Sequence, residues 1–301
     1  MPYAPASGER GMGINVDQEN LEAVEAWNTV LFEKFVRFRD LVTTALGAHG
    51  TAVLERHSPQ PGSRVLDVGC GFGDTTQVIA RKVGPKGEAV GVDAAERFIS
   101  AAREEAKAAG VENARFLVVD VQTGNLEGPY DQTFARMGTM FFASPVAAFR
   151  NIRRSMKDGG LLSMVVWRRK VDNPFFYDIE QRVLEIIPHP EKKADQVTCG
   201  PGPFSMADPH VVSEQLRAAG FDRVGFERFD APVKIGEDVA HALEFATALG
   251  PAGEILRLAG EEGERRRPEV LRALSEVLEP LARPEGVFGA SSTWIVSARA
   301  G

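Results

Sequence analysis

The sequence predicts a doubly wound α/β fold, with a mostly parallel sheet between layers of helices. First, the apolar run 64–68 leads through a glycine-rich turn into an amphipathic segment that Gly84-Pro85 ends. Second, further apolar runs alternate with helical segments along the following chain. Third, an acidic residue lies at or just after the end of three predicted strands. Together these features predict repeated β–α units with polar groups gathered at one edge of the sheet.

Composition limits the class of protein. The 301 residues suffice for one large α/β domain with additions. Hydrophobic residues make up 44% and charged residues 26%, which are ordinary values for a globular chain. The net charge is −7, and the densest basic cluster, 265–267, follows three glutamates and so predicts a solvated helix face. We therefore expect neither a nucleic acid nor an anionic membrane as partner.

Cysteine and hydropathy patterns suggest a cytoplasmic protein. Of the two cysteines, Cys70 lies in the glycine turn, so we expect no disulfide with Cys199. The N-terminus lacks a signal-peptide pattern, and no apolar run reaches membrane-spanning length. No cysteine–histidine cluster has the spacing of metal ligands, so no metal site is expected.

The glycine turn itself distinguishes two kinds of cofactor. Gly69, Gly71 and Gly73 give G-x-G-x-G, whereas dinucleotide sites use G-x-G-x-x-G. Asp67 lies inside the preceding strand, and an acid beside the turn suits a ligand that carries an ammonium group better than a pyrophosphate. The stretch 65–73 resembles the first motif of the class I S-adenosylmethionine (SAM)-dependent methyltransferases, V-L-D-x-G-C-G-x-G.

The next strand ends supply the other expected cofactor contacts. Strand 88–92 ends at Asp93, whose carboxylate can accept both ribose hydroxyls. Strand 115–119 ends at Asp120, and the resemblance implies that this acid binds the adenine amino group while the Val121 N–H contacts the ring. Strand 131–137 should border the reactive methyl group. The full expected cofactor set is Trp27, Asp67, Gly69, Cys70, Gly71, Gly73, Thr75, Asp93, Ala94, Phe98, Asp120, Val121, Arg136 and Met137.

The N-terminal region predicts helices at about 21–38 and 40–57, after a segment 1–17 expected to be mobile. Trp27-Asn28 resembles a W-N pair that many small-molecule methyltransferases carry in this helix. Two interpretations remain open for its aromatic residues. They either pack onto the core or form a lid over the cofactor.

The second half predicts additions to the minimal fold. Strand 161–167 precedes a helix and a loop, then helix 208–219 and strand 223–229, and the last strand is 292–298. The resemblance implies a Rossmann-like sheet of seven strands, with the last one antiparallel between strands five and six. We divide one integrated catalytic domain into 1–60 (N-terminal helical lid), 61–167 (SAM-binding core), 168–235 (helical and loop insertion with strand six), 236–287 (helical cap insertion) and 288–301 (last strand).

The resemblance implies an enzyme that methylates a small molecule in biosynthesis. The nearest likeness is to ubiquinone/menaquinone C-methyltransferases and related natural-product enzymes. An apolar acceptor pocket is expected from Phe141, Phe142, Phe175, Phe176, Phe204 and Met206. Candidates for a general base are His189, His241 and Tyr177. The acceptor atom (O, N or C) and the oligomeric state (monomer or homodimer) stay open. Two alternative functions are a catalytically inactive SAM-binding regulator and a nicotinamide-dependent oxidoreductase.

Overall fold

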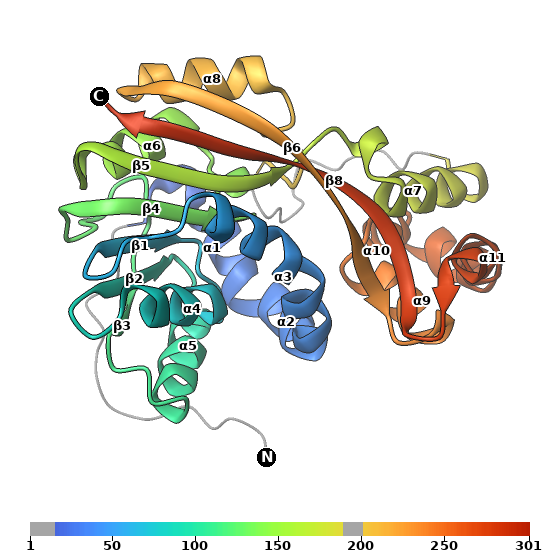
Figure 1. Cartoon of the computed structure of the whole chain (residues 1–301). Helices are drawn as coiled ribbons and strands as arrows, with labels where there is room; N and C mark the ends of the chain where they lie inside the picture. Colours follow the sequence, from blue (N-terminus) through green and yellow to red (C-terminus); the bar gives the residue numbers. More distant parts are fainter. Residues whose placement is uncertain (1–15, 189–200) are drawn as a thin grey trace.

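The computed structural model describes residues 16–188 and 201–301 and centres on one mixed sheet (Figure 1). The strand order is β3-β2-β1-β4-β5-β8-β6. Strands β1 to β5 pair in parallel, and β8 is antiparallel to both β5 and β6. The predicted fold class is therefore confirmed. The strands are β1 (Arg64–Val68), β2 (Glu88–Asp93), β3 (Ala114–Val118), β4 (Tyr130–Arg136), β5 (Met156–Trp167), β6 (Phe221–Gly236), β7 (Ala282–Arg283) and β8 (Gly286–Ala300).

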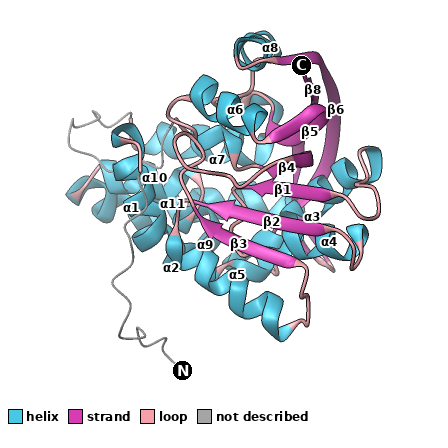
Figure 2. Ribbon diagram, turned by 90° about the vertical axis from the view of Figure 1, so that its left-hand side faces the viewer, coloured by secondary structure: helices cyan, strands magenta, loops and turns pink. Residues whose placement is uncertain are grey.

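Helices surround this sheet, as Figure 2 shows from the side. Helices α4 and α5 pack against β1, β2 and β3, while α6 and α8 pack against each other and against β5 and β6. The helices are α1 (Leu21–Ala26), α2 (Phe32–Arg37), α3 (Arg39–Arg56), α4 (Asp74–Val83), α5 (Glu96–Ala108), α6 (Pro145–Arg154), α7 (Pro174–Ile186), α8 (Pro209–Ala218), α9 (Val239–Ala248), α10 (Pro251–Leu258) and α11 (Glu261–Leu278).

Strand β1 is central because its side chains can be buried on both faces of the sheet. Val65, Leu66 and Val68 are almost completely inaccessible to solvent. The neighbours β2 and β4 run parallel to β1 on either side. Ile79 and Val83 of α4 belong to the same buried core, which explains the amphipathic pattern after the glycine turn.

The sixth and last strands are longer than predicted. Strand β6 covers 221–236 instead of 223–229, and β8 covers 286–300 instead of 292–298. The two strands stay paired from Phe221 with Ala300 to Gly236 with Val287. Charged residues and Pro232 interrupt the hydrophobic alternation of β6, but an edge strand with one exposed face tolerates both. The two-residue strand β7, which the sequence analysis did not include, adds an eighth strand beside β8.

The far part of the β6–β8 ribbon carries a helical region, which lies at the right in Figure 1. Helices α9, α10 and α11 contact one another, and α7 packs against α10 and α11. Phe175 of α7 lies directly over Gly289 of β8, where an added Cβ would be 2.3 Å from the phenylalanine Cβ. Contacts of this kind join the helical region, here called the cap (α7 and α9–α11), to the ribbon.

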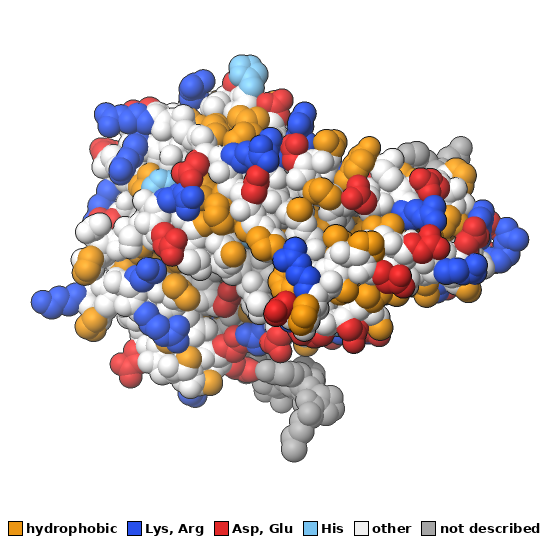
Figure 3. All heavy atoms as spheres, turned by 45° about the vertical axis from the view of Figure 1, so that its right-hand side comes forward, with side chains coloured by type: hydrophobic (Ala, Val, Ile, Leu, Met, Phe, Trp, Pro, Cys, Tyr) orange, Lys and Arg blue, Asp and Glu red, His pale blue; other side chains and the backbone are white. Residues whose placement is uncertain are grey.

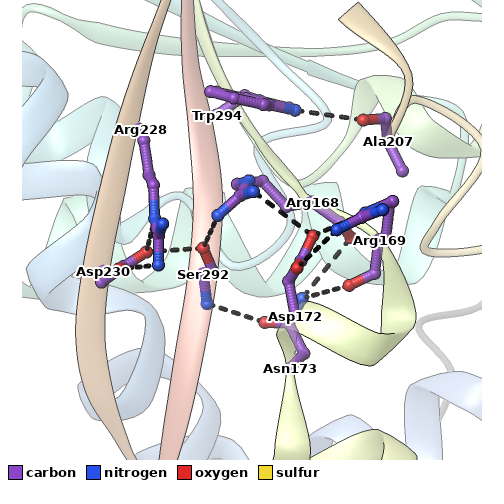
Figure 4. Close-up of polar contacts among 9 residues, drawn as sticks. All are labelled: Arg168, Arg169, Asp172, Asn173, Ala207, Arg228, Asp230, Ser292 and Trp294. Atoms are coloured by element: carbon purple, nitrogen blue, oxygen red, sulfur yellow. Dashed lines mark hydrogen bonds and ion pairs between the residues drawn. The ribbon is translucent and has the colours of Figure 1, made fainter.

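A polar network joins the ribbon, the end of β5 and the start of α7 (Figure 4). Ser292 is its centre. The Ser292 N–H donates to Asn173 Oδ1 at 2.8 Å, and the Ser292 hydroxyl donates to Asp230 Oδ1 at 2.5 Å. Arg168 Nη1 donates to Ser292 Oγ at 2.8 Å, and another nitrogen of Arg168 lies 3.4 Å from Asp172. Because Asn173 and Ser292 are buried, these bonds fix the angle at which the cap leaves the sheet.

The N-terminal helices run from the cofactor edge of the sheet to the cap. A π-helical turn, Trp27–Leu31, joins α1 to α2. At the end of α2, the ring of Phe38 lies 5.5 Å from that of Phe245 in α9 and stacks on His241 at 5.7 Å. Arg37 pairs with Glu244 at 2.5 Å. The helices predicted at 21–38 and 40–57 are thus present, and they bridge two regions of the molecule.

The charged surface agrees with the expectation of a solvated helix face at 265–267. Arg265, Arg266 and Arg267 pair with Glu262, Glu269 and Glu264 within α11, each at spacing i, i+3. Figure 3 shows acidic and basic side chains interspersed over this face. Among the helices of the described residues, none combines the length and apolarity needed to cross a membrane.

Candidate cofactor and acceptor site

The expected cofactor residues lie at one edge of the sheet. Strands β3, β2, β1 and β4 are parallel neighbours, so their carboxyl ends share this edge. Asp120, Asp93, the glycine turn and Met137 follow or end these strands in that order. Such edges bind ligands because loops and helix N-termini meet there.

The glycine turn leaves one backbone position open for a close ligand. Gly71 has φ +53°, and a Cβ added there would meet only the Phe98 ring, at 3.9 Å. By contrast, a Cβ on Gly69 would lie 2.9 Å from the Gly138 backbone, so that glycine is required by the approach of the loop after β4. The backbone of the turn is therefore closely packed at Gly69 and has free space beside it at Gly71.

Asp93 is bound to the turn as well as to its own loop. Its Oδ2 accepts the Gly71 N–H at 3.1 Å, and its Oδ1 accepts the Ala95 N–H at 3.0 Å. Burial raises the pKa of Asp93, and these backbone bonds oppose the rise. The side chain of Asp93 keeps partial exposure at the sheet edge, as does its neighbour Ala94. Each oxygen thus retains acceptor capacity for a donor from a ligand.

Asp67 lies beneath the turn, out of contact with solvent. It is 1% exposed, and its Oδ2 accepts the Thr76 hydroxyl at 2.6 Å. Burial raises the pKa of Asp67 to about 7, while the Thr76 bond and the positive charge of Arg136 oppose the rise. In this conformation Asp67 can act on a ligand through its charge but does not line the surface of the site. The sequence analysis had expected it beside the ligand.

The raised pKa of Asp67 predicts a specific pH dependence of stability. Its pKa is about 7 in the folded chain and about 3.8 without burial, so this group favours folding at low pH and loses that contribution as pH rises between those values. We expect Asp67→Asn, which cannot titrate, to gain in free energy of unfolding over the wild type across this window, by at most roughly 4 kcal/mol above about pH 7. Urea unfolding of both ligand-free proteins at a series of pH values measures this difference. Parallel curves would contradict the assigned pKa.

The remaining residues of the turn and β4 are firmly packed. Arg136 donates from Nη2 to both oxygens of Asp74, at 2.9 and 2.7 Å, and so joins the end of β4 to the start of α4. Cys70 and Thr75 are buried, and burial raises the pKa of the Cys70 thiol. Met137 is buried too and has φ +59°, which is uncommon for a residue with a side chain.

Asp120 is engaged by the N-terminal segment. Asn20 Nδ2 lies 3.1 Å from Oδ1 and 3.0 Å from Oδ2, and the Asp17 N–H donates to Oδ2 at 2.9 Å. Asp120 is 3% exposed as a result. Val121 is also buried, and its carbonyl accepts the Asn151 side-chain amide. The sequence analysis missed Asp17 and Asn20, because contacts 100 or more residues apart leave no local pattern.

Aromatic rings of the N-terminal helices cover the same edge. Trp27 lies 6.3 Å from Phe98 and 5.2 Å from Phe141, measured between ring centroids. Phe32 lies 4.9 Å from Phe98. Phe98 is itself 4.9 Å from Phe72 in the turn. The helices are held there by the Arg97 N–H, which donates to Asn28 Oδ1 at 3.2 Å. The rings therefore pack onto the core at the edge where the cofactor is expected, and their role as a lid over the cofactor stays a prediction.

The residues expected to line an acceptor pocket form more than one group. Phe175, Phe176 and Phe204 form a chain of ring contacts with Trp167 at the end of β5. Met206 is fully buried. Phe141 contacts Trp27 instead, and Phe142 packs on Phe149 of α6. A small apolar hollow extends the first group into the cap and is lined by Phe175, Phe176, Ile179, Ile235, Ala242, Phe245, Ala246, Gly250 and Pro251.

The candidates for a general base lie in different environments. Tyr177 is 36% exposed on α7, and His241 stacks on Phe38 where α9 meets the N-terminal helices. His189 lies outside the described residues. The sequence analysis passed over His49, which is fully buried between α3 and the sheet with Nε2 3.0 Å from Ser291 Oγ. Burial lowers the pKa of His49 to about 4, so it is neutral at physiological pH.

Comparisons with known proteins agree with this geometry. Residues 59–195 match the family model described as a methyltransferase domain. Aklanonic acid methyltransferase DauC of Streptomyces sp. (strain C5) is 30% identical over 115 residues, 38% of this chain and 52% of that protein. Demethylmenaquinone methyltransferase of Bacillus cytotoxicus is 36% identical over 107 residues, 34% of this chain and 43% of that protein. The chain therefore spans about half the length of these curated relatives.

A solved structure extends the likeness of the fold beyond the matched domain. The YcgJ protein of Bacillus subtilis superposes with a TM-score of 0.52 at 17% identity, over 85% of this chain and 97% of that protein. At that identity the likeness concerns the fold alone. These findings show that residues 59–195 match a methyltransferase domain, and the glycine turn and the strand order agree with that match.

Proposed function

We propose that the protein transfers a methyl group from SAM to a small, substantially hydrophobic acceptor. The observation that carries the proposal is the open backbone at Gly71, with Asp93 bound to it at the carboxyl edge of the sheet. A Cβ there would occupy the space in which a cofactor must approach the turn, so the residues present fit such a ligand. SAM supplies an activated methyl group whose departure leaves a neutral thioether.

The protein's own groups would bind and orient the cofactor. Asp93 would accept the ribose hydroxyls while it keeps its two backbone bonds. Asp67, whose pKa of about 7 leaves it partly ionised at neutral pH, would favour an ammonium group above the turn through its ionised form, and the ammonium group would favour that form in turn. Trp27 and Phe141 would exclude water beside the end of β4. Alignment and a dry site are what an in-line displacement chiefly requires, so no fixed catalytic triad is expected.

Apolar side chains support the choice of acceptor. The rings of Phe175, Phe176 and Phe204 offer apolar surface of the kind against which an aromatic or aliphatic molecule packs. The names of the two curated relatives point to aklanonic acid and demethylmenaquinone as their substrates. An acceptor whose hydroxyl or carbon must lose a proton would need a base, and His241, His189 and Tyr177 remain the proposed candidates.

Binding and transfer assays separate this function from its alternatives. Calorimetry with SAM and with NAD should detect binding of SAM alone. In a second assay, labelled methyl from SAM should be transferred to at least one acceptor in a panel of hydrophobic phenols, quinols and amines. Binding of NAD instead would favour an oxidoreductase. Binding of SAM without transfer to any acceptor would favour a regulatory protein.

Asp93 gives a first quantitative test of the cofactor site. Asp93→Ala should weaken SAM binding about tenfold or more, because charge-assisted hydrogen bonds of roughly 1.5–3 kcal/mol are lost. Calorimetry on the folded variant measures the effect. Asp158→Ala is a matched control, since Asp158 is an exposed acid that pairs with Arg153, away from the turn. Unchanged affinity in Asp93→Ala would remove this residue from the site.

A further inference from the structure

Three donors already surround the Asp120 carboxylate in this structure. The Gln122 N–H donates to Oδ1 at 2.9 Å and the Asp17 N–H to Oδ2 at 2.9 Å. The Asn20 amide nitrogen lies within 3.1 Å of both oxygens, so one N–H is shared between them. Each oxygen therefore accepts a backbone N–H and a share of the Asn20 amide.

The same contacts also close the space around the carboxylate. Asp120 is 3% exposed and Asn20 is 8% exposed, although 100 residues separate them in the chain. Gln122 lies two residues from Asp120 and belongs to the same loop, whereas Asp17 and Asn20 both come from the segment that leads into α1. Two of the three donor residues can therefore leave together if that segment moves.

We propose that Asp17 and Asn20 form a latch on Asp120 and that SAM must displace it for its adenine amino group to bind there. The inference rests on the proposed function and on the role that the family resemblance implies for Asp120, namely binding of that amino group. Opening the latch alone leaves a buried carboxylate short of donors, which is unfavourable. The incoming adenine amino group replaces one of the lost donors. Binding of adenine and release of the segment with Asp17 and Asn20 are therefore coupled.

The latch ties cofactor entry to the aromatic cover. Asn20 directly precedes α1, which leads into Trp27, so release of Asn20 frees the N-terminal end of the helix that holds Trp27 near Phe98. The other end stays anchored, because Arg97 binds Asn28 and Arg37 pairs with Glu244. Asn20 is thus a positioning residue that acts through Asp120 and Trp27, without any role in the methyl transfer itself.

The test uses two ligands that differ at the amino group. The probes are S-adenosylhomocysteine and its analogue with hydrogen in place of the 6-amino group, and their association rates are measured by stopped-flow tryptophan fluorescence. Asn20→Ala should speed association of S-adenosylhomocysteine about tenfold, since one charge-assisted hydrogen bond no longer has to be broken. The analogue, which has no donor to exchange, should show little change.

Controls keep the outcome decisive. Val30→Ala alters an exposed side chain of the same segment (62% exposed) and should leave both rates unchanged. Asn20→Leu keeps a similar side-chain size and has no donor, so it should also speed association if Asn20→Ala folds poorly. Wild-type protein that binds neither SAM nor S-adenosylhomocysteine would refute the proposed function. Wild-type binding with unchanged rates in both variants, or equal acceleration of both ligands, would refute the latch alone.

Discussion

Gly71→Val should abolish measurable SAM binding while the ligand-free protein remains folded. The branched side chain would enter the open space above the turn, where the backbone must meet the ligand. It would also disturb the N–H that Asp93 accepts at 3.1 Å. We expect an affinity loss of about a hundredfold or more, because steric exclusion adds to the loss of at least one hydrogen bond. Calorimetry measures the affinity, and thermal unfolding measures the stability.

Backbone strain requires its own control in this experiment. Gly71 has φ +53°, so any side chain there costs about 1–3 kcal/mol irrespective of a ligand. Gly110, after α5, has φ +65° with nothing within 4 Å of an added Cβ. Gly110→Val should therefore lower stability similarly and leave affinity for SAM intact. Comparable affinity in a folded Gly71→Val protein would contradict the position of the cofactor.

Removal of residues 1–28 should reduce turnover greatly and weaken cofactor binding less. This change removes Trp27 from Phe98 and Phe141, so water would reach the end of β4. The glycine turn and Asp93 stay in place, because their mutual hydrogen bond does not involve the N-terminal helices. Methyl transfer measured beside calorimetric affinity separates the two effects. Trp27→Ala is the milder variant and should lower turnover with little change in affinity.

Hydrogen exchange tests the same cover without a mutation. Exchange of the amides of residues 12–35 should change when S-adenosylhomocysteine binds. Amides of 21–35 should gain protection, because the ligand would complete the surface on which Trp27 and Phe32 pack. The Asp17 amide should lose protection, because the ligand releases it from Asp120. Amides of α11, in the cap, serve as the internal control and should change little. Identical exchange over 12–35 with and without ligand would show that these helices only pack on the core.

Local sequence patterns predicted the strand and the turn at the carboxyl edge of the sheet. The run 65–68 and the glycines after it specify a buried strand and a tight turn through their own side chains and φ angles. Asp93 follows because the ends of adjacent parallel strands share an edge. The length of β6 did not follow, since burial of only one face lets Asp230 and Pro232 occupy a strand. The contact between Asn20 and Asp120 depends on tertiary packing and has no local signal.

The residues predicted for the acceptor pocket also differ in how far the sequence determined their position. Phe175 and Phe176 come together with Phe204 because two apolar segments meet over the end of β5. The sequence analysis assigned Phe142 to the same pocket because its side chain is apolar, yet its ring packs on Phe149 of α6. In a short apolar run that follows a strand, a ring can point to either side of the chain. Tertiary packing determines the side that each ring takes, and the run itself does not.

The β6–β8 ribbon makes helices α9–α11 of the cap an exchangeable module. The chain leaves the ribbon after Gly236 and returns at Gly286, and Gly236 is paired with Val287. The intervening helices could be replaced by a short turn, or by another helical segment, without a change in the order of the strands. Evolution or an engineer could thus replace α9–α11 by exchanging one contiguous stretch of gene, while the parallel strands and the glycine turn stay constant.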